Sequence, residues 1–371
     1  MSDPLFQPFS IGSLSLRNRI VMSPMGQGKA PGGIPDARYV EYFQARAEGE
    51  TGLIISGTTA VDHPQAAFDD HEPHMHGAAV PVWRRIVSAV HARGGRMIAQ
   101  LGHAGLQGLA PNPPAWLGLS PSGLWMQGAQ VGWEPVGEMR EAPMTAAQID
   151  DVIAAFARSA LTAQSIGFDG IEIHGAHGFL IDQFLWSHTN QRTDDYGAER
   201  TRFAAEIIAA CRSAVGPELP ILFRFSQFKM TDYAAKLGQT AAELEALLRP
   251  LVDAGVTMFD CSQRRFWRPE FPDSSLNLAG WVKKLSGRPT IGGGGVGLEK
   301  TSLEYGEEGV YGHVASASTA HLDELRERID RGEFDLVSIG RAILGDPHWA
   351  RKVRTGDTDS LQPYRPEVLV W

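Results

Sequence analysis

The chain has 371 residues, of which 43% are hydrophobic and 21% charged, so its composition is that of a folded globular protein and excludes disordered and fibrous classes. The formal net charge of −9 disfavours attraction to nucleic acid or to an anionic membrane, and small molecules are the expected partners. No apolar run approaches the roughly 18 residues of a membrane span, and Met1–Pro4 lack a signal-peptide pattern, so we expect a cytoplasmic protein.

Short β-rich runs alternate with longer amphipathic segments along the chain, which predicts an α/β fold. Eight such units favour a single closed (β/α)₈ barrel, a TIM barrel, over an open doubly wound sheet, because eight strands close without leaving an edge. We therefore expect one domain over residues 1–371. The predicted strands are Arg19–Ser23, Gly52–Ser56, Arg96–Leu101, Gly170–His174, Ile221–Ser226, Met258–Ser262, Pro289–Gly292 and Leu336–Gly340.

Some segments between the strands have recognisable ends. Thr145 can cap a helix over Thr145–Ile166, and Gly255 can end one over Thr240–Ala254. The stretch Ala104–Pro143 is rich in Gly, Pro and Trp and too long for a plain loop, so it predicts a lid or hairpin over the barrel mouth, about residues 104–143. Residues from about 355 to 371 are expected to form a C-terminal tail.

Polar side chains stand at the ends of four predicted strands, where barrel enzymes place their reactive groups: Gln100, His174, Arg224 and Arg341. Any one of them could merely bond a neighbouring loop, but four at one mouth indicate an active site. His174 and His177 could aim paired hydrogen-bond donors at a carbonyl or phenolate oxygen. A catalytic zinc is the rival interpretation, yet no third ligand is adjacent, and we expect no metal.

Gly292–Gly297 matches the pattern G-x-G-x-x-G, although it comes late and lacks the acidic residue of a dinucleotide-binding fold. A better interpretation pairs this loop with Gly340 and Arg341, because the loops after strands seven and eight of such barrels commonly bind phosphate. Backbone amides and one guanidinium suit a phosphate monoester. The residues thus predict a phosphate-bearing cofactor in the barrel mouth.

Several motifs together resemble one family, the old yellow enzymes, which are NADH:flavin oxidoreductases that hold FMN in a (β/α)₈ barrel. The resemblance spans about Pro4 to Arg354. Its motifs are Asn18-Arg19-Ile20-Val21-Met22-Ser23-Pro24-Met25, Gln100, Gly167-Phe168-Asp169-Gly170-Ile171-Glu172-Ile173-His174-Gly175-Ala176-His177-Gly178, Asn190-Gln191-Arg192-Thr193-Asp194-Asp195-Tyr196-Gly197, Arg224-Phe225-Ser226, Ile339-Gly340-Arg341 and Asp346-Pro347.

The resemblance implies a role for each candidate site residue. The flavin ring would lie against Ser23, Pro24, Met25 and Gly26, with Ala60 and Gln100 on its pyrimidine side and Arg224 near N1 and O2. The phosphate would be held by Gly294, Gly295, Gly340 and Arg341. His174 and His177 would be catalytic, gripping the substrate's oxygen, and Phe179 would contact the substrate.

The implied activity has two steps, in which NADH or NADPH reduces FMN and an activated alkene, such as an α,β-unsaturated carbonyl, or a quinone-like acceptor then receives the hydride. Such alternation predicts ping-pong kinetics.

Three departures from the family pattern qualify this hypothesis. Phe179 stands where a tyrosine often donates a proton, Gly26 where a Thr or Cys often contacts flavin O4, and the stretch after Gly197 is short. A dehydrogenase or demethylase that oxidises its substrate is one alternative, but its precedents are longer and carry a metal cluster, for which Cys211 and Cys261 are too few. A flavin-binding barrel with little turnover is another. The oligomeric state stays open, a homo-oligomer included.

Overall fold

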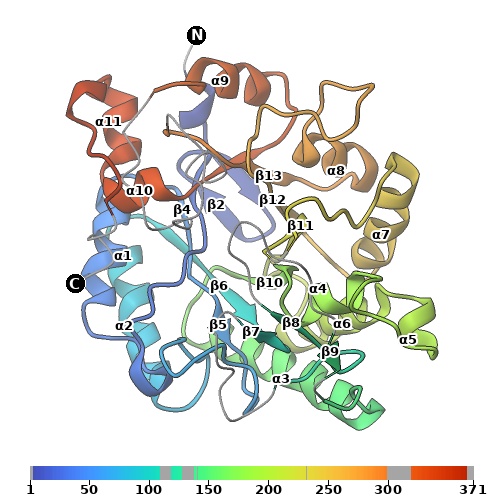
Figure 1. Ribbon diagram of the computed structural model, residues 1–371. Coiled ribbons are helices and arrows are strands. Elements are labelled where there is room, and N and C mark those ends of the chain that lie inside the picture. The colour runs from blue at the N-terminus through green and yellow to red at the C-terminus, as the bar shows by residue number, and fades with distance from the viewer. Residues whose placement is uncertain are drawn as a thin grey trace.

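A computed structural model gives the fold of this chain and describes residues 3–108, 118–127, 138–139, 141–230, 232–298 and 319–365. Eight parallel strands form a closed barrel with helices around it (Figure 1). The strand order is β3-β4-β6-β10-β11-β12-β13-β14, and β14 pairs with β3 to close the ring. The predicted (β/α)₈ architecture is confirmed.

The barrel strands agree with the predicted ranges to within one residue, except at the carboxyl ends of two strands. β10 continues past His174 to His177, and β11 continues past Ser226 to Lys229, because His177 still pairs with Lys229 after a register shift. His177 therefore lies at the last position of a bulged strand, where its φ is +66°. The strands are β3 (Ile20–Met22), β4 (Leu53–Ile55), β6 (Arg96–Gly102), β10 (Gly170–His177), β11 (Ile221–Lys229), β12 (Met258–Ser262), β13 (Thr290–Gly293) and β14 (Leu336–Ile339).

The amino-terminal end of the barrel is filled with apolar side chains. First or early residues of several strands, such as Leu53, Leu222 and Met258, form one buried cluster. The hairpin of β1 (Phe9–Ile11) and β2 (Leu14–Leu16) adds two leucines to this cluster and so covers that end. Because water is excluded there, a site for chemistry must lie at the opposite, carboxyl end.

The longer helices outside the barrel bury one apolar face each. Thr145 caps the helix α3 (Ala146–Ser165), because its Oγ1 accepts from the backbone N–H of Gln148 while Gln148 Oε1 accepts from the backbone N–H of Thr145. Thr240 caps α7 (Ala241–Asp253) by accepting from the backbone N–H of Glu243. Both predicted helix starts are confirmed. The helices are α1 (Tyr39–Glu48), α2 (Val80–His91), α3 (Ala146–Ser165), α4 (Leu180–Leu185), α5 (Asp195–Ala198), α6 (Arg202–Val215), α7 (Ala241–Asp253), α8 (Leu278–Ser286), α9 (Leu322–Asp330), α10 (Arg341–Gly345) and α11 (Trp349–Thr355).

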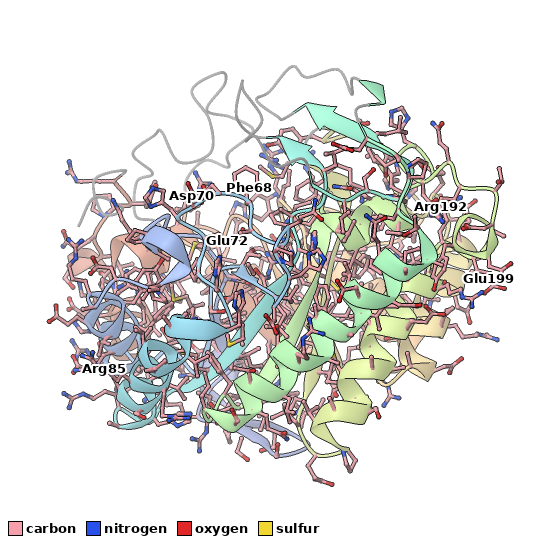
Figure 2. All side chains as sticks on the ribbon, turned by 90° about the horizontal axis from the view of Figure 1, so that it is seen from below. Phe68, Asp70, Glu72, Arg85, Arg192 and Glu199 are labelled. Carbon is pink, nitrogen blue, oxygen red and sulfur yellow. The ribbon has the colours of Figure 1, made fainter. Side chains whose placement is uncertain are left out.

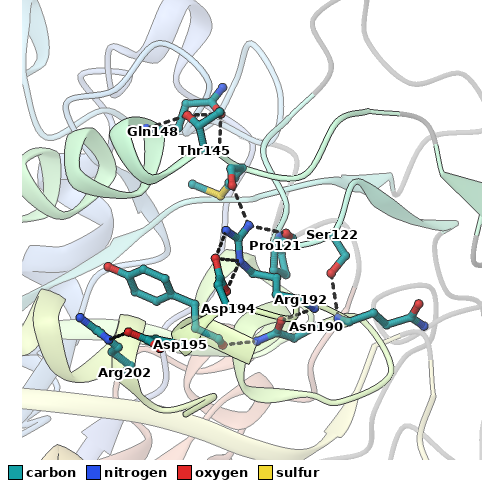
Figure 3. Close-up of polar contacts among 12 residues, drawn as sticks. Pro121, Ser122, Thr145, Gln148, Asn190, Arg192, Asp194, Asp195 and Arg202 are labelled. Atoms are coloured by element: carbon teal, nitrogen blue, oxygen red, sulfur yellow. Dashed lines mark hydrogen bonds and ion pairs between the residues drawn. The ribbon is translucent and has the colours of Figure 1, made fainter. Parts of the chain in front are cut away.

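The insertion after β6 is described only in part, so its role as a lid stays a prediction. Its described residues include the short strands β7 (Gln107–Gly108), β8 (Leu124–Gln127) and β9 (Glu138–Met139), which form a small sheet. Arg192 anchors the base of the insertion to the barrel, since its guanidinium donates to the carbonyls of Pro121 and Met144 at 2.8 and 2.6 Å (Figure 3).

Candidate active site

A cavity of about 470 Å³ opens at the carboxyl end of the barrel. Its wall includes every predicted site residue except Ala60, and they come from the ends of six different strands or the loops that follow them. The lining thus brings together Ser23, Pro24, Met25, Gly26, Gln100, His174, His177, Phe179, Arg224, Gly294, Gly295, Gly340 and Arg341.

One wall of the cavity is made of glycine backbone. Gly294 and Gly295 follow β13 with φ values of +104° and +80°, a region that side-chain-bearing residues rarely adopt. A Cβ at Gly294 would lie 2.2 Å from the carbonyl oxygen of Gln263, so only glycine fits there. Gly340 follows β14 and precedes Arg341 at the start of α10, which places the two predicted loops on the same cavity.

Thr58 and Gln100 form the part of the cavity that the sequence predicted for Ala60 and Gln100. Thr58 Oγ1 donates to Gln100 Oε1 at 2.8 Å, and both residues line the cavity. Ala60 is buried in the short strand β5 (Thr59–Ala60), where it pairs with Gly102. Thr58, two residues earlier in the chain, therefore lines the cavity where Ala60 was expected to do so. The sequence after the second predicted strand gave no signal to show which of Thr58 and Ala60 faces the cavity.

Arg224 lines the cavity, and its guanidinium is paired with a carboxylate. Its Nη1 makes an ion pair with Asp260, the register partner of Arg224 on the next strand. Asp260 in turn faces Glu172, which accepts a hydrogen bond from Gln100 Nε2 at 2.7 Å. Neither carboxyl was predicted as a site residue, although an acidic residue inside the apolar run of β12 was an available signal.

His174 and His177 meet at the end of β10, with ring centroids 5.2 Å apart. The bulge turns His177 back toward β12, where its Nε2 lies 2.7 Å from Ser262 Oγ, so Ser262 fixes that ring. Nδ1 of His174 is buried and has no hydrogen-bond partner among the described residues.

Both imidazoles are neutral at ordinary pH. Burial, together with the charge of Arg224, lowers the pKa of His174 to about 3. Burial and then the neighbouring His174 hold the pKa of His177 well below its ordinary value. Each ring therefore carries one N–H and can donate one hydrogen bond without a change of charge.

Apolar side chains surround the histidine pair. The ring of Phe179, at the start of α4, lies 4.5 Å from that of His174, and the ring of Phe228 lies 5.5 Å from that of His177. Both phenylalanines line the cavity. A ligand that reaches the histidines would therefore lie against hydrocarbon on this side.

The loop after β5 contributes a further side of the cavity, including Phe68 and Glu72. Figure 2 shows these two residues and Asp70 at the same end of the molecule as the strands of the insertion. Burial raises the pKa of Glu72 to about 8, although the backbone N–H of Phe68 donates to its carboxyl.

Neither a metal cluster nor a membrane span emerges from the described residues. The rings of His74 and His76 stack at 4.7 Å, and within the described ranges no group of three or more His, Cys, Asp or Glu side chains could hold a metal ion. No helix in the described part of the chain is long and apolar enough to cross a membrane.

The barrel and its glycine wall are typical of enzymes that hold a phosphate-bearing cofactor at the carboxyl end of the strands. The chain belongs to the NADH:flavin oxidoreductase / NADH oxidase family, whose pattern matches residues 4–360. The predicted old yellow enzyme family and its FMN cofactor are confirmed at the level of this family.

Individual relatives cover the chain almost completely. An NADH oxidase of Thermoanaerobacter brockii is 32% identical over 96% of the chain, which spans about half (52%) of that longer protein. The 12-oxophytodienoate reductase 2 of Arabidopsis thaliana is 32% identical over 93% of the chain and 87% of its own length. The structure of morphinone reductase in complex with tetrahydroNAD superposes with a TM-score of 0.78 at 25% identity, covering 98% of this chain and 93% of that one.

The cavity has hydrogen-bond donors and open space that suit FMN. The glycine wall lets a phosphate approach backbone amides closely, and the buried Nε2 of Gln263 and Nε of Arg224 lack partners among the described residues. Gly26 has open space at its Cβ position, so it leaves room beside the ring. These features fit the cofactor.

Proposed function

We propose that this protein is an FMN-dependent reductase that uses NADH or NADPH to reduce an activated alkene, such as an α,β-unsaturated carbonyl, or a quinone-like acceptor. The observation that carries the proposal is the neutral pair His174 and His177 on the same cavity as the glycine wall of Gly294, Gly295 and Gly340. A similarity to 12-oxophytodienoate reductase and to morphinone reductase supports the ene-reductase type.

The residues would divide the cavity into a cofactor side and an acceptor side. Gly294, Gly295, Gly340 and Arg341 would hold the phosphate of FMN, and its ring would lie between Ser23, Pro24, Met25 and Gly26 and the polar group of Thr58, Gln100 and Arg224. The chemistry supplied by bound FMN is hydride uptake from the nicotinamide and hydride delivery to the acceptor.

On the acceptor side, the histidine N–H groups would donate to the acceptor's oxygen and draw electron density from its double bond. Because both imidazoles are neutral, they would polarise the substrate without carrying a charge that competes with the flavin site. Phe179 and Phe228 would hold the apolar part of the acceptor and exclude water.

The first experiment is an absorbance spectrum of the purified protein, followed by anaerobic titration with NADH and with NADPH. A flavin band that bleaches with one nucleotide and returns with an enone supports the reductase. A flavin band that neither nucleotide bleaches would favour a binding barrel, and bleaching by a small substrate in the absence of nicotinamide would favour a dehydrogenase.

The histidine pair is tested with a phenol, which should give a long-wavelength charge-transfer band with the oxidised flavin. We expect H174A to weaken phenol binding at least about tenfold, since it removes a hydrogen bond worth roughly 1.5 kcal/mol or more in a buried site. H188A is the matched control, because His188 is exposed and does not line the cavity. Phenol affinity that survives in the H174A/H177A double variant would remove these residues from the acceptor site.

A further inference from the structure

Four polar side chains lie inside the barrel at the floor of the cavity, on four neighbouring strands, and three of them line it. Gln100 of β6 and Glu172 of β10 are register partners, as are Arg224 of β11 and Asp260 of β12. Glu172 is fully buried and Asp260 is 1% exposed. Water therefore does not solvate these carboxyls, and their hydrogen bonds must come from the protein.

The two carboxyl groups need a proton that neither Arg224 nor Gln100 supplies. The side chains of Glu172 and Asp260 lie within hydrogen-bonding reach of each other. Yet Glu172 Oε2 and Asp260 Oδ1 are buried atoms with no donor in the described part of the chain. Two carboxylates have only acceptors, whereas one protonated carboxyl can donate to the other and satisfy both oxygens at once.

The surroundings decide which carboxyl holds the proton. The guanidinium of Arg224 makes its ion pair with Asp260, so the negative charge is best placed on that side chain. Glu172 receives only the neutral amide of Gln100, at 2.7 Å. Burial and the negative charge of Asp260 raise the pKa of Glu172 well above its ordinary value, although Arg224 opposes this shift.

We propose that Glu172 is protonated at neutral pH and donates to Asp260, and that it acts as a positioning residue which orients Gln100 and leaves Arg224 opposed by a single carboxylate. With Glu172 protonated, Glu172, Asp260 and Arg224 together carry no net charge. If it were ionised, the group would carry one net negative charge directly below the cavity. That charge would disfavour an anionic reduced flavin there.

The same proton fixes which way the Gln100 amide points. Because Glu172 Oε2 donates to Asp260, Oε1 remains an acceptor for Gln100 Nε2, and the Gln100 oxygen then accepts from Thr58 at 2.8 Å. Thr58, Gln100, Glu172, Asp260 and Arg224 thus form one hydrogen-bonded chain across the floor of the cavity. The inference rests on the proposed function only in taking this floor as the flavin side.

Infrared spectroscopy tests the proton directly and needs no turnover. At pH 7 we expect a carbonyl band of a protonated carboxylic acid that shifts when glutamate is labelled with ¹³C and is lost in E172Q. E72Q is the matched control, since Glu72 is a separate buried acid whose band should disappear independently. A spectrum in which no glutamate-sensitive band depends on Glu172 overturns the proposal, whatever the protein's activity.

The flavin midpoint potential tests the charge. The side-chain amide introduced by E172Q is neutral and keeps one acceptor and one donor group, so the potential should equal that of the unaltered protein within error. D260N removes a negative charge beside Arg224 and should raise the potential. If E172Q raises the potential as D260N does, Glu172 is ionised and the proposal fails. Should no flavin reduction occur at all, the proposed function fails while the infrared result still decides the protonation of Glu172.

Discussion

Phe179 occupies the position where the resemblance places a proton-donating tyrosine, and its ring packs against His174 on the cavity. A phenyl ring has no proton to give, so the carbon opposite the hydride must be protonated by another donor. Tyr233 is no obvious replacement, because it does not line the cavity and its ring lies 4.0 Å from the guanidinium of Arg264.

We expect F179Y to speed the oxidative half-reaction with a simple enone by about 10²-fold, the lower end of the contribution of a general acid. The reductive half-reaction with NADH or NADPH should stay unchanged, because it needs no proton from this position. Stopped-flow measurement of each half-reaction separates the two. F228Y is the matched control, since Phe228 lines the same cavity beside His177 instead of His174. If the oxidative rate of F179Y does not rise although its hydroxyl is seen to face the flavin, another acid already donates the proton.

The loops after β13 and β14 were the elements that the sequence predicted best. Glycines at the ends of two strands could be recognised from their spacing, and the structure shows why Gly294 must be glycine. Thr58 and Asp260 were harder to predict as site residues. Each matters because of a partner on another strand, Gln100 for Thr58 and Arg224 for Asp260, and the sequence does not show these pairings. The bulge that carries His177 to the end of β10 also has no signature in the sequence, since it arises from pairing with β11.

At the level of these loops, we expect R341A to weaken FMN binding about tenfold or more. Removing one charge-assisted contact with phosphate costs roughly 1.5–3 kcal/mol, and about 1.4 kcal/mol corresponds to a factor of ten. Titration of the flavin-free protein with FMN measures the effect. R351A on α11 is the matched control, because Arg351 is exposed and does not line the cavity. Equal FMN affinity in R341A and R351A would remove Arg341 from the phosphate site.

For the whole molecule, continuous apolar runs predicted strands covered on both faces, and the number of these runs, eight, favoured the barrel over an open sheet. The closure at the other end, by the β1–β2 hairpin, was not predicted, because its strands alternate apolar residues with exposed serines and so do not form continuous apolar runs. The insertion after β6 was predicted from its composition alone, and Arg192 of a family motif supplies its anchor.

Three histidines at the carboxyl end of the barrel, the buried His103 and His174 and the half-buried His177, are neutral, which couples the stability of the molecule to pH. Burial lowers the pKa of all three, to about 3 for His174. In the unfolded chain each histidine takes up a proton below about pH 6.5. The unfolded state then binds more protons than the folded state, so these histidines make stability fall as pH drops below that value. Glu172 and Glu72 have the opposite effect between about pH 4.3 and 6.5. They keep their protons in the folded state and lose them in the unfolded state, so they make stability rise as pH drops.

We therefore expect the flavin-free protein to lose stability between about pH 6.5 and pH 5, and each buried histidine to contribute about 1.4 kcal/mol per pH unit to that loss. H174N should reduce the slope by one such contribution, because asparagine does not titrate. Urea unfolding at several pH values measures the free energy of unfolding, with a constant m-value as the check that the unfolding reaction is the same. E72Q should change the pH dependence of stability in the opposite direction. Glu72, with its raised pKa of about 8, makes the protein less stable as pH rises toward that value, and glutamine removes this contribution. If H174N keeps the slope of the unaltered protein, then His174 is protonated in the folded state and cannot be the neutral donor of the acceptor site.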